Sequence, residues 1–229
     1  MPDIKVMGSI GVRRRGVHIT PSSRMTRGLL AMLAADANRR IGSSTLCEAL
    51  WDDPPRSAQP NLRSYVSQLR TLLRDHDCAI VTHQGSPGAY SLRIASDQLD
   101  LSRFRNLAER ARRASRDRPE QAMDSYESAL NLWRGDHDGM LPDTVTMRTL
   151  STGWELEYGR ALERYADLAI ANGRTGTLIT HLYAHTWRHP DRPGAVSLLK
   201  AAIAGRADAA LADLPADVAM DVYAAGALT

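Results

Sequence analysis

The fold is decided by the stretch LCEALWDDPPRSAQPNLRSYVSQLRTLL, residues 46–73. The dipeptide Pro54-Pro55 predicts a break between two helices, because proline cannot continue a helical hydrogen-bond ladder. The second helix is expected from Ser57 or Ala58 to Arg74. Its apolar residues recur at helical spacing: Leu62, Tyr65, Val66, Leu69, Leu72 and Leu73. This stripe predicts an amphipathic helix with one buried face.

The opposite face of this helix is basic and polar and has no acid before Asp75. It consists of Arg63, Ser64, Ser67, Gln68, Arg70 and Arg74. Arginine can contact phosphate or guanine, and glutamine can pair with adenine. The pattern therefore favours a helix that enters the major groove of DNA, over the alternative of an ordinary solvated face.

Two further helices are predicted before this one. The residues Pro21-Ser22-Ser23 indicate a helix start, followed by a helical pattern to about Ala35. A short helix that Ser43 or Ser44 can cap should end at Trp51. Residues 4–20 have strand composition.

Two strands are predicted after the basic helix. The segments AIVTHQ (79–84) and AYSLRI (89–94) flank the turn sequence GSPG, which indicates a hairpin. Three helices and a terminal hairpin, preceded by strands, form the order of a winged helix-turn-helix. We assign residues 1–96 to this domain.

The rest of the chain, 97–229, is helical in pattern. Helices are expected at about 101–117, 119–133, 144–171, 175–188 and 195–213. Successive helix pairs with Ala at packing positions and Gly at turns are typical of a tetratricopeptide-like repeat. The predicted fold class is therefore α+β, a winged helix followed by an all-α domain.

Charge is distributed unevenly along the chain. Residues 1–96 carry 13 Arg and Lys against 7 Asp and Glu, whereas residues 97–229 carry 16 against 19. A basic front half indicates a polyanionic partner. With no long apolar run, no secretory signal, and no metal-site spacing around Cys47 and Cys78, we expect a cytoplasmic, nucleoid-associated protein without membrane contact.

The sequence offers little support for a metal site, a catalytic site or a nucleotide-binding site. His181, His185 and His189 share a helix face at i, i+4 and i+8, but no Cys or acid completes a metal site, so a solvated or interface face is favoured. His137 and Asp138 have no accompanying nucleophile, and neither GxxxxGK[ST] nor GxGxxG occurs. We expect no enzyme activity, no cofactor and no metal. The aromatic residues Trp51, Tyr65 and Trp133 are interpreted as packing residues, and the arginines between Arg110 and Arg118, which alternate with acids, as a solvated face.

Four stretches together resemble the Streptomyces antibiotic regulatory proteins (SARP family). They are the quoted 46–73 segment, GAYSLRI (88–94), LDLSRFRNL (99–107) and ALNLWRG (129–135). The resemblance implies an OmpR-type winged helix joined to a bacterial transcriptional activation domain. It also implies a homodimer that binds direct repeats in double-stranded DNA near a promoter and recruits RNA polymerase to genes for secondary metabolism.

The resemblance places the recognition helix over Arg63–Arg70 and puts Arg24 and Arg27 at basic positions facing phosphate. The complete set of predicted DNA contacts is Arg24, Arg27, Asn61, Arg63, Ser64, Ser67, Gln68, Arg70, Arg74, His83 and Gln84. An alternative function is a helical-repeat interaction module in which the winged helix does not bind DNA.

Three features depart from the family pattern. The wing sequence THQGSPGAY has no arginine where related winged helices often carry one, so either His83 and Gln84 take its place or minor-groove contact is weak. Pro193-Gly194 replaces an acidic helical stretch after His189-Pro190, although the later pairs Gly205-Arg206 and Ala210-Leu211 do fit the family. The ending DLPADVAMDVYAAGALT differs from the usual closing helices, so we expect a shortened activation domain.

Overall fold

A computed structural model describes residues 4–14, 16–74, 76–85, 88–135, 137, 139–190 and 192–204. The chain divides into two compact units, residues 1–158 and 159–229. Asp138, Gly205-Arg206 and Ala210-Leu211, which the sequence singled out, and the end of the helix expected at 195–213 lie outside the described residues.

The first unit opens with a small antiparallel sheet of three strands in the order β1-β2-β3. These are β1 (Ile4–Lys5), β2 (Gly11–Arg14) and β3 (Val17–Ile19). Val12 pairs with Ile4 on one side and with Ile19 on the other. Ile4 and Val12 are fully buried, so this sheet contributes to the core beneath the helices that follow.

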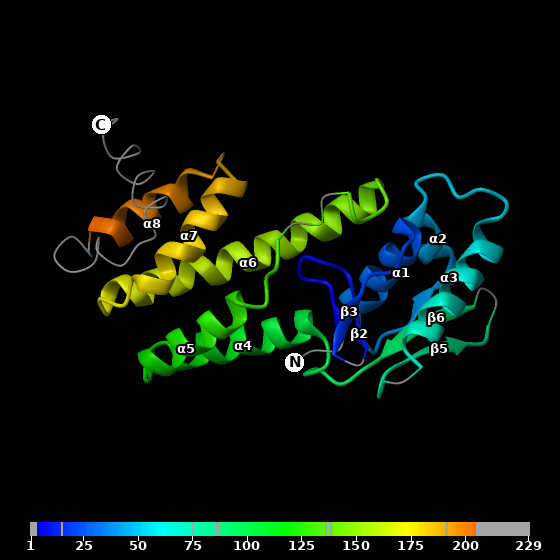
Figure 1. The fold of residues 1–229 in the computed structure, drawn as a ribbon, viewed down its shortest axis with the longest axis horizontal. Coiled ribbons are helices and arrows are strands. Elements are labelled where there is room, and N and C mark those ends of the chain that lie inside the picture. The colour runs from blue at the N-terminus through cyan, green and yellow to red at the C-terminus, as the bar shows by residue number, and fades with distance from the viewer. Residues whose placement is uncertain are drawn as a thin grey trace. The chain divides into compact units, whose positions relative to one another are not determined.

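Three helices follow the sheet, as the sequence predicted: α1 (Arg24–Ala35), α2 (Ser43–Leu50) and α3 (Ala58–Leu72) (Figure 1). Their apolar faces meet in a shared core that contains the completely buried residues Leu29, Leu30, Leu46, Leu50 and Leu62. Ser23 caps α1 through its hydroxyl, which accepts from the backbone N–H of Met25. The predicted cap of α2 is wrong: Gly42 occupies the N-cap without a side-chain bond, and Ser43 is already helical and buried.

The wing is a second antiparallel sheet in the order β4-β6-β5. The hairpin strands β5 (Ala79–His83) and β6 (Ala89–Arg93) confirm the prediction. A further strand, β4 (Ile41–Gly42), pairs with Tyr90 and Ala89 of β6 and was not predicted. This third strand fixes the wing to the turn before α2.

The remaining described chain is helical and confirms the α+β fold class. The first unit contains α4 (Asp100–Ala114) and α5 (Pro119–Leu130), which pack against each other, and α6 (Val145–Ala171) begins there. The second unit contains the end of α6, α7 (Gly176–Arg188) and α8 (Pro193–Ala204). Among the described residues, no helix is long and apolar enough to cross a membrane.

Asp100 joins the first helix of the helical region to the N-terminal sheet. Its buried carboxylate accepts the backbone N–H groups of Val6 and Met7 at 2.9–3.0 Å and that of Leu101 at 2.7 Å. Burial raises the pKa of Asp100 to about 6, and the three N–H donors oppose that rise only in part. Removal of this carboxylate would leave buried donors without an acceptor.

The segment 134–144 contacts the winged helix at a second place in the first unit. Gly8, at φ +108°, lets the backbone of Arg134 approach so closely that a Cβ there would lie 2.8 Å from its carbonyl carbon. Gly28 of α1 does the same for the ring of Pro142, at 2.7 Å. The hydroxyl of Thr144 donates to the carbonyl of Ala49 at 2.8 Å, and both groups are buried.

His137 completes this contact. Its buried ring lies between Ser151, whose hydroxyl is 3.1 Å from Nδ1, and the carbonyl of Val6, 2.5 Å from Nε2. The N–H of Gly8 also lies 3.3 Å from Nε2, but one nitrogen cannot donate and accept at once. The shorter contact indicates that Nε2 carries the proton and donates to Val6. These contacts cross the proposed boundary at 96/97 and hold the winged helix and α4–α5 in one compact unit.

Candidate nucleic-acid interface

The position of α3 depends on its apolar face. Leu62, Val66 and Leu69 are buried, as the spacing predicts, and together with buried Ala58 they anchor the helix to α1 and α2. Tyr65 is half-buried and stacks on Trp51 with ring centroids 6.1 Å apart, which confirms the packing role of both aromatics. The helix is therefore held along its whole length, and its other face is fixed in direction.

That outer face is exposed. Arg63, Ser64, Ser67, Gln68 and Arg70 all lie on it with their side chains open to solvent. The chain places no acidic residue within α3. The arrangement suits a polyanion with readable base edges, because it combines two guanidinium groups, two hydroxyls and an amide.

Gln68 is oriented by a residue that the sequence did not single out. Thr26, buried within α1, donates its hydroxyl to Oε1 of Gln68 at 3.0 Å. An amide held at its oxygen presents its NH₂ group in a defined direction. A threonine inside the otherwise apolar face of α1 was the only sequence signal for this contact.

Arg70 ties α3 to the wing. Its Nε and Nη2 both lie within 3.0 Å of the carbonyl oxygen of Ile80 in β5, and Nη2 also donates to the hydroxyl of Thr82 at 2.7 Å. A phosphate contact by Arg70 would therefore have to use Nη1. The same guanidinium fixes the angle between α3 and the hairpin.

Arg27 also forms hydrogen bonds within the protein. Its Nε donates to the carbonyl of Met140 at 2.7 Å, and Nη1 donates to the carbonyls of Pro21 and Ser22. These bonds attach the start of α1 to the segment 134–144. Phosphate contact from Arg27 would have to come from Nη2.

The other predicted contacts lie around α3 and the wing. Arg24 and Arg74 are exposed at the start of α1 and after the end of α3, and Asn61 donates to the hydroxyl of Ser57 at 3.3 Å. In the wing, His83 lies 2.8 Å from the hydroxyl of buried Ser91, whereas Gln84 is exposed. The tip residues Ser86 and Pro87 lie outside the described residues.

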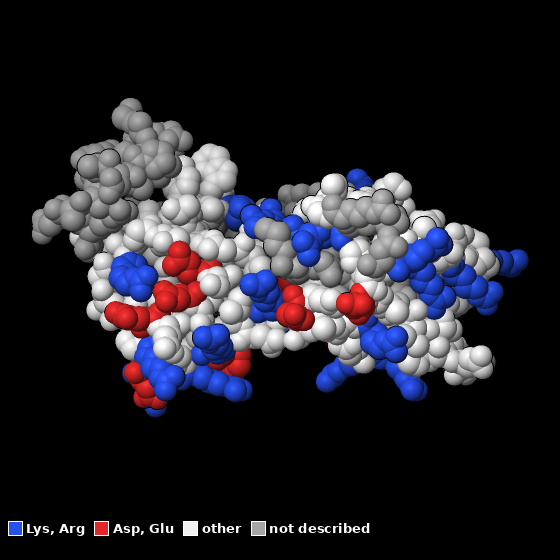
Figure 2. Space-filling view, turned by 60° about the horizontal axis from the view of Figure 1, so that its bottom comes forward, with Lys and Arg blue, Asp and Glu red and all other residues white. Residues whose placement is uncertain are grey.

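Electrostatics favour an anion over this part of the molecule. In Figure 2 the winged-helix part, at the right, shows many Lys and Arg side chains and few Asp and Glu on the face in view. Among the residues whose exposure the structure describes, the exposed arginines of the winged helix are Arg24, Arg39, Arg40, Arg56, Arg63, Arg70, Arg74 and Arg93. Exposed cations of this number supply the salt-dependent attraction on which DNA binding rests.

Outside this interface, the structure tests two further interpretations of the sequence. Trp133 packs on Tyr158 with ring centroids 5.1 Å apart and meets His137 edge-on, which confirms its packing role. The expectation of a solvated or interface face for the three histidines is wrong for His185, which is buried beside His189. No group of three or more His, Cys, Asp or Glu in the described chain could hold a metal ion.

Comparison with known proteins assigns both parts of the chain. The model of the bacterial transcriptional activator domain matches residues 99–216, and that of the C-terminal domain of transcriptional regulatory proteins matches residues 17–86. The transcriptional regulatory protein EmbR of Mycobacterium tuberculosis is 33% identical over 196 residues, which cover 83% of this chain and 50% of EmbR. The regulatory protein DnrI of Streptomyces peucetius is 30% identical over 200 residues, covering 82% of this chain and 72% of DnrI.

A solved structure agrees with these matches. The structure of Mycobacterium tuberculosis EmbR in complex with a low-affinity phosphopeptide has a TM-score of 0.72 and 29% sequence identity, covering 97% of this chain and 58% of that one. The chain thus spans about half the length of EmbR. Because the activator-domain match takes in just over half of the chain and DnrI is matched over most of its length, the chain belongs to the SARP family, whose members join an OmpR-type winged helix to a bacterial transcriptional activator domain.

Proposed function

We propose that this protein is a sequence-specific DNA-binding activator of genes for secondary metabolism. The observation that carries the proposal is the exposed, acid-free face of α3 on a helix whose other face is buried. Family membership supports the same function. The proposed role is binding, and we assign no catalytic residue.

In this proposal α3 lies in the major groove. Arg63, Ser64, Ser67 and Gln68 face base edges, and Gln68 is suited to adenine because Thr26 holds its amide. Asn61, at the N-terminal part of the helix, lies next to this set. One good bidentate contact contributes about 1–3 kcal/mol of discrimination against the wrong base.

Phosphates are contacted around this helix. Arg24 and Arg74 are exposed and can reach the backbone, whereas Arg27 and Arg70 contribute through the one guanidinium nitrogen that their internal bonds leave for it. In the wing, His83 and Gln84 take the place of the arginine of related proteins. Such contacts fix the register of the protein on the duplex and carry no sequence information.

We infer that residues 1–96 form the DNA-binding domain and 97–229 the activation domain. A single winged helix reads few base pairs, so we propose a homodimer on direct repeats one helical turn apart. We further propose that the bound dimer recruits RNA polymerase and that the protein resides at the nucleoid in the cytoplasm.

A fluorescence-anisotropy titration tests the proposal. The purified chain is titrated into a random-sequence duplex and into a duplex selected from a random pool, each at two salt concentrations. We expect salt-steep binding to both, with roughly 10³-fold or greater preference for the selected duplex. Absence of binding to either duplex at low salt would refute the proposal and favour an interaction module.

A further inference from the structure

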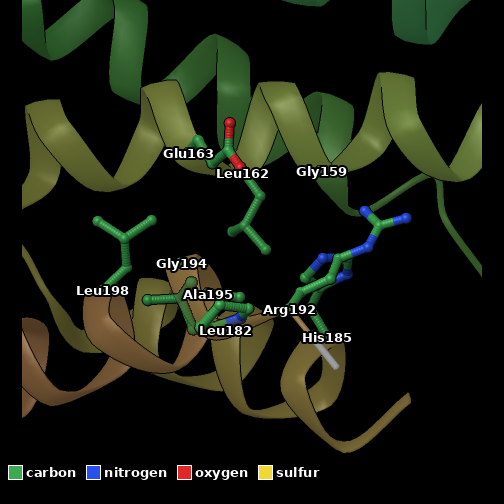
Figure 3. A pocket seen from close by; sticks show the side chains of 10 residues that line it. Gly159, Leu162, Glu163, Leu182, His185, Arg192, Gly194, Ala195 and Leu198 are labelled. Carbon is green, nitrogen blue, oxygen red and sulfur yellow. The ribbon is translucent and has the colours of Figure 1, made fainter. Parts of the chain in front are cut away.

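The second unit contains a cavity that the DNA-binding role does not use. It lies between the end of α6, α7 and α8 and has a volume of about 260 Å³ (Figure 3). Three leucines form its apolar wall: Leu162 of α6, Leu182 of α7 and Leu198 of α8. Cavities for drug-sized ligands are larger, about 300–1,000 Å³, so this one suits a small molecule.

Polar groups gather at one end of the cavity. Figure 3 shows Arg192 and His185 side by side there, away from Leu198. Arg192 is half-buried, and no carboxylate among the described residues forms an ion pair with it. The first turn of α8, Pro193 to Ala195, lines the same space, so the positive end of that helix adds to the charge of the guanidinium.

Gly159 makes room for these two side chains. It lies inside α6, where glycine is less favourable than alanine. A methyl group on Gly159 would lie 3.2 Å from Nη1 of Arg192 and 3.7 Å from Nε2 of His185. The absence of a side chain therefore lets the guanidinium and the imidazole approach the helix backbone at the cavity.

His185 contributes a hydrogen-bonding group and not a charge. Burial, together with the positive charges of His189, Arg192 and Arg188, lowers the pKa of His185 to about 4. The ring is therefore neutral near pH 7. Glu163 lines the cavity from an exposed position, so a second negative charge on a ligand would be repelled at the rim.

We propose that this cavity binds a small monocarboxylate with a short apolar tail. The carboxylate would lie against Arg192 and the start of α8, and the tail against Leu162, Leu182 and Leu198. The α3 face contributes no residue to this cavity, so the ligand-binding and the DNA-binding proposals are tested separately.

The test is an NMR titration of the ¹⁵N-labelled full chain with sodium hexanoate, using hexan-1-ol as the neutral probe of the same length. Hexanoate is expected to shift the amide resonances of Gly159, Gly194 and Ala195 in a saturable manner. Hexan-1-ol should bind at least about tenfold more weakly, because a charge-assisted hydrogen bond is worth about 1.5–3 kcal/mol.

Two variants locate the carboxylate. Arg192→Gln should weaken hexanoate binding about tenfold or more and leave hexan-1-ol unchanged. Lys200→Gln removes an exposed cation of the same helix outside the cavity and should leave both affinities within about twofold. Spectral dispersion equal to wild type shows that each variant is folded.

Three results would overturn the proposal. They are the absence of saturable shifts at the three amides, equal affinity for hexanoate and hexan-1-ol, and equal losses in the Arg192 and Lys200 variants. The last result would show that hexanoate responds only to net charge.

Discussion

The exposed face of α3 and the buried contact that the winged helix makes with Asp100 and with the segment 134–144 are both rich in polar groups, yet their partners differ. At the contact, Asp100 accepts from Val6 and Met7, and Thr144 donates to Ala49, all within the buried interior. On α3, Arg63 and Ser67 open to solvent from a rigid helix. The buried contact therefore uses its polar groups to build the fold, whereas the α3 face leaves its polar groups exposed, where a ligand can reach them.

The largest expected effect on stability is at Gly28. In Gly28→Ala the new methyl group would lie 2.7 Å from the ring of Pro142 and 2.9 Å from Leu50. Neither neighbour is the free end of a long flexible chain, so we expect a loss of about 3 kcal/mol in the free energy of unfolding, measured by urea denaturation. Gly153→Ala, on α6 with no atom within 4 Å of the new carbon, is the matched control and should stabilise the chain slightly.

Asp100→Asn is expected to cost about 2 kcal/mol, because the amide NH₂ would face a backbone N–H that the carboxylate now accepts. Urea denaturation at pH 7 measures the loss. An unchanged midpoint would show that the contact with β1 does not depend on this carboxylate.

The pH dependence of the free energy of unfolding should also report on Asp100. The pKa of Asp100 is raised to about 6, above its unfolded value near 4, so between these values the folded chain binds the proton more tightly. This residue therefore makes the folded state more stable at pH 5 than at pH 7, by about 1 kcal/mol. The difference should disappear in Asp100→Asn, and its persistence there would assign the effect to other groups.

Arg70→Ala probes a residue that lies on the α3 face and also bonds to the wing. Loss of its bonds to Ile80 and Thr82 should lower the free energy of unfolding by about 1 kcal/mol. We also expect weaker binding to every duplex and a salt slope lower by about one. A change in stability without a change in the salt slope would mean that Arg70 only holds the wing.

The sequence was sufficient to predict the features that depend on a single helix or hairpin. The stripe from Leu62 to Leu69 is enough to place α3, to bury one face and to expose the other. The hairpin followed from its GSPG turn. Both depend on residues close together in the chain.

Features that depend on distant partners could not be predicted. Arg27 donates to the carbonyl of Met140, which is 113 residues away in the chain. The sequence therefore could not distinguish this arginine from any other basic residue of α1. The two residues of β4 are too few to show a strand pattern, and they pair only because β6 lies beside them. His185 is buried by the packing of its own unit, which the i, i+4, i+8 spacing could not reveal.

The central claim, that the exposed face of α3 reads bases, is tested most directly by a ratio of affinities. The ratio divides the affinity for a selected duplex by the affinity for a random duplex. It is measured for wild type, Arg63→Ala, Gln68→Ala and the control Arg110→Ala, which replaces an exposed arginine of α4. We expect Arg63→Ala and Gln68→Ala to lower this ratio about tenfold or more, corresponding to about 1–3 kcal/mol, and Arg110→Ala to leave it unchanged. If Arg63→Ala and Gln68→Ala lose affinity equally for both duplexes, this face does not read the sequence and the claim is contradicted.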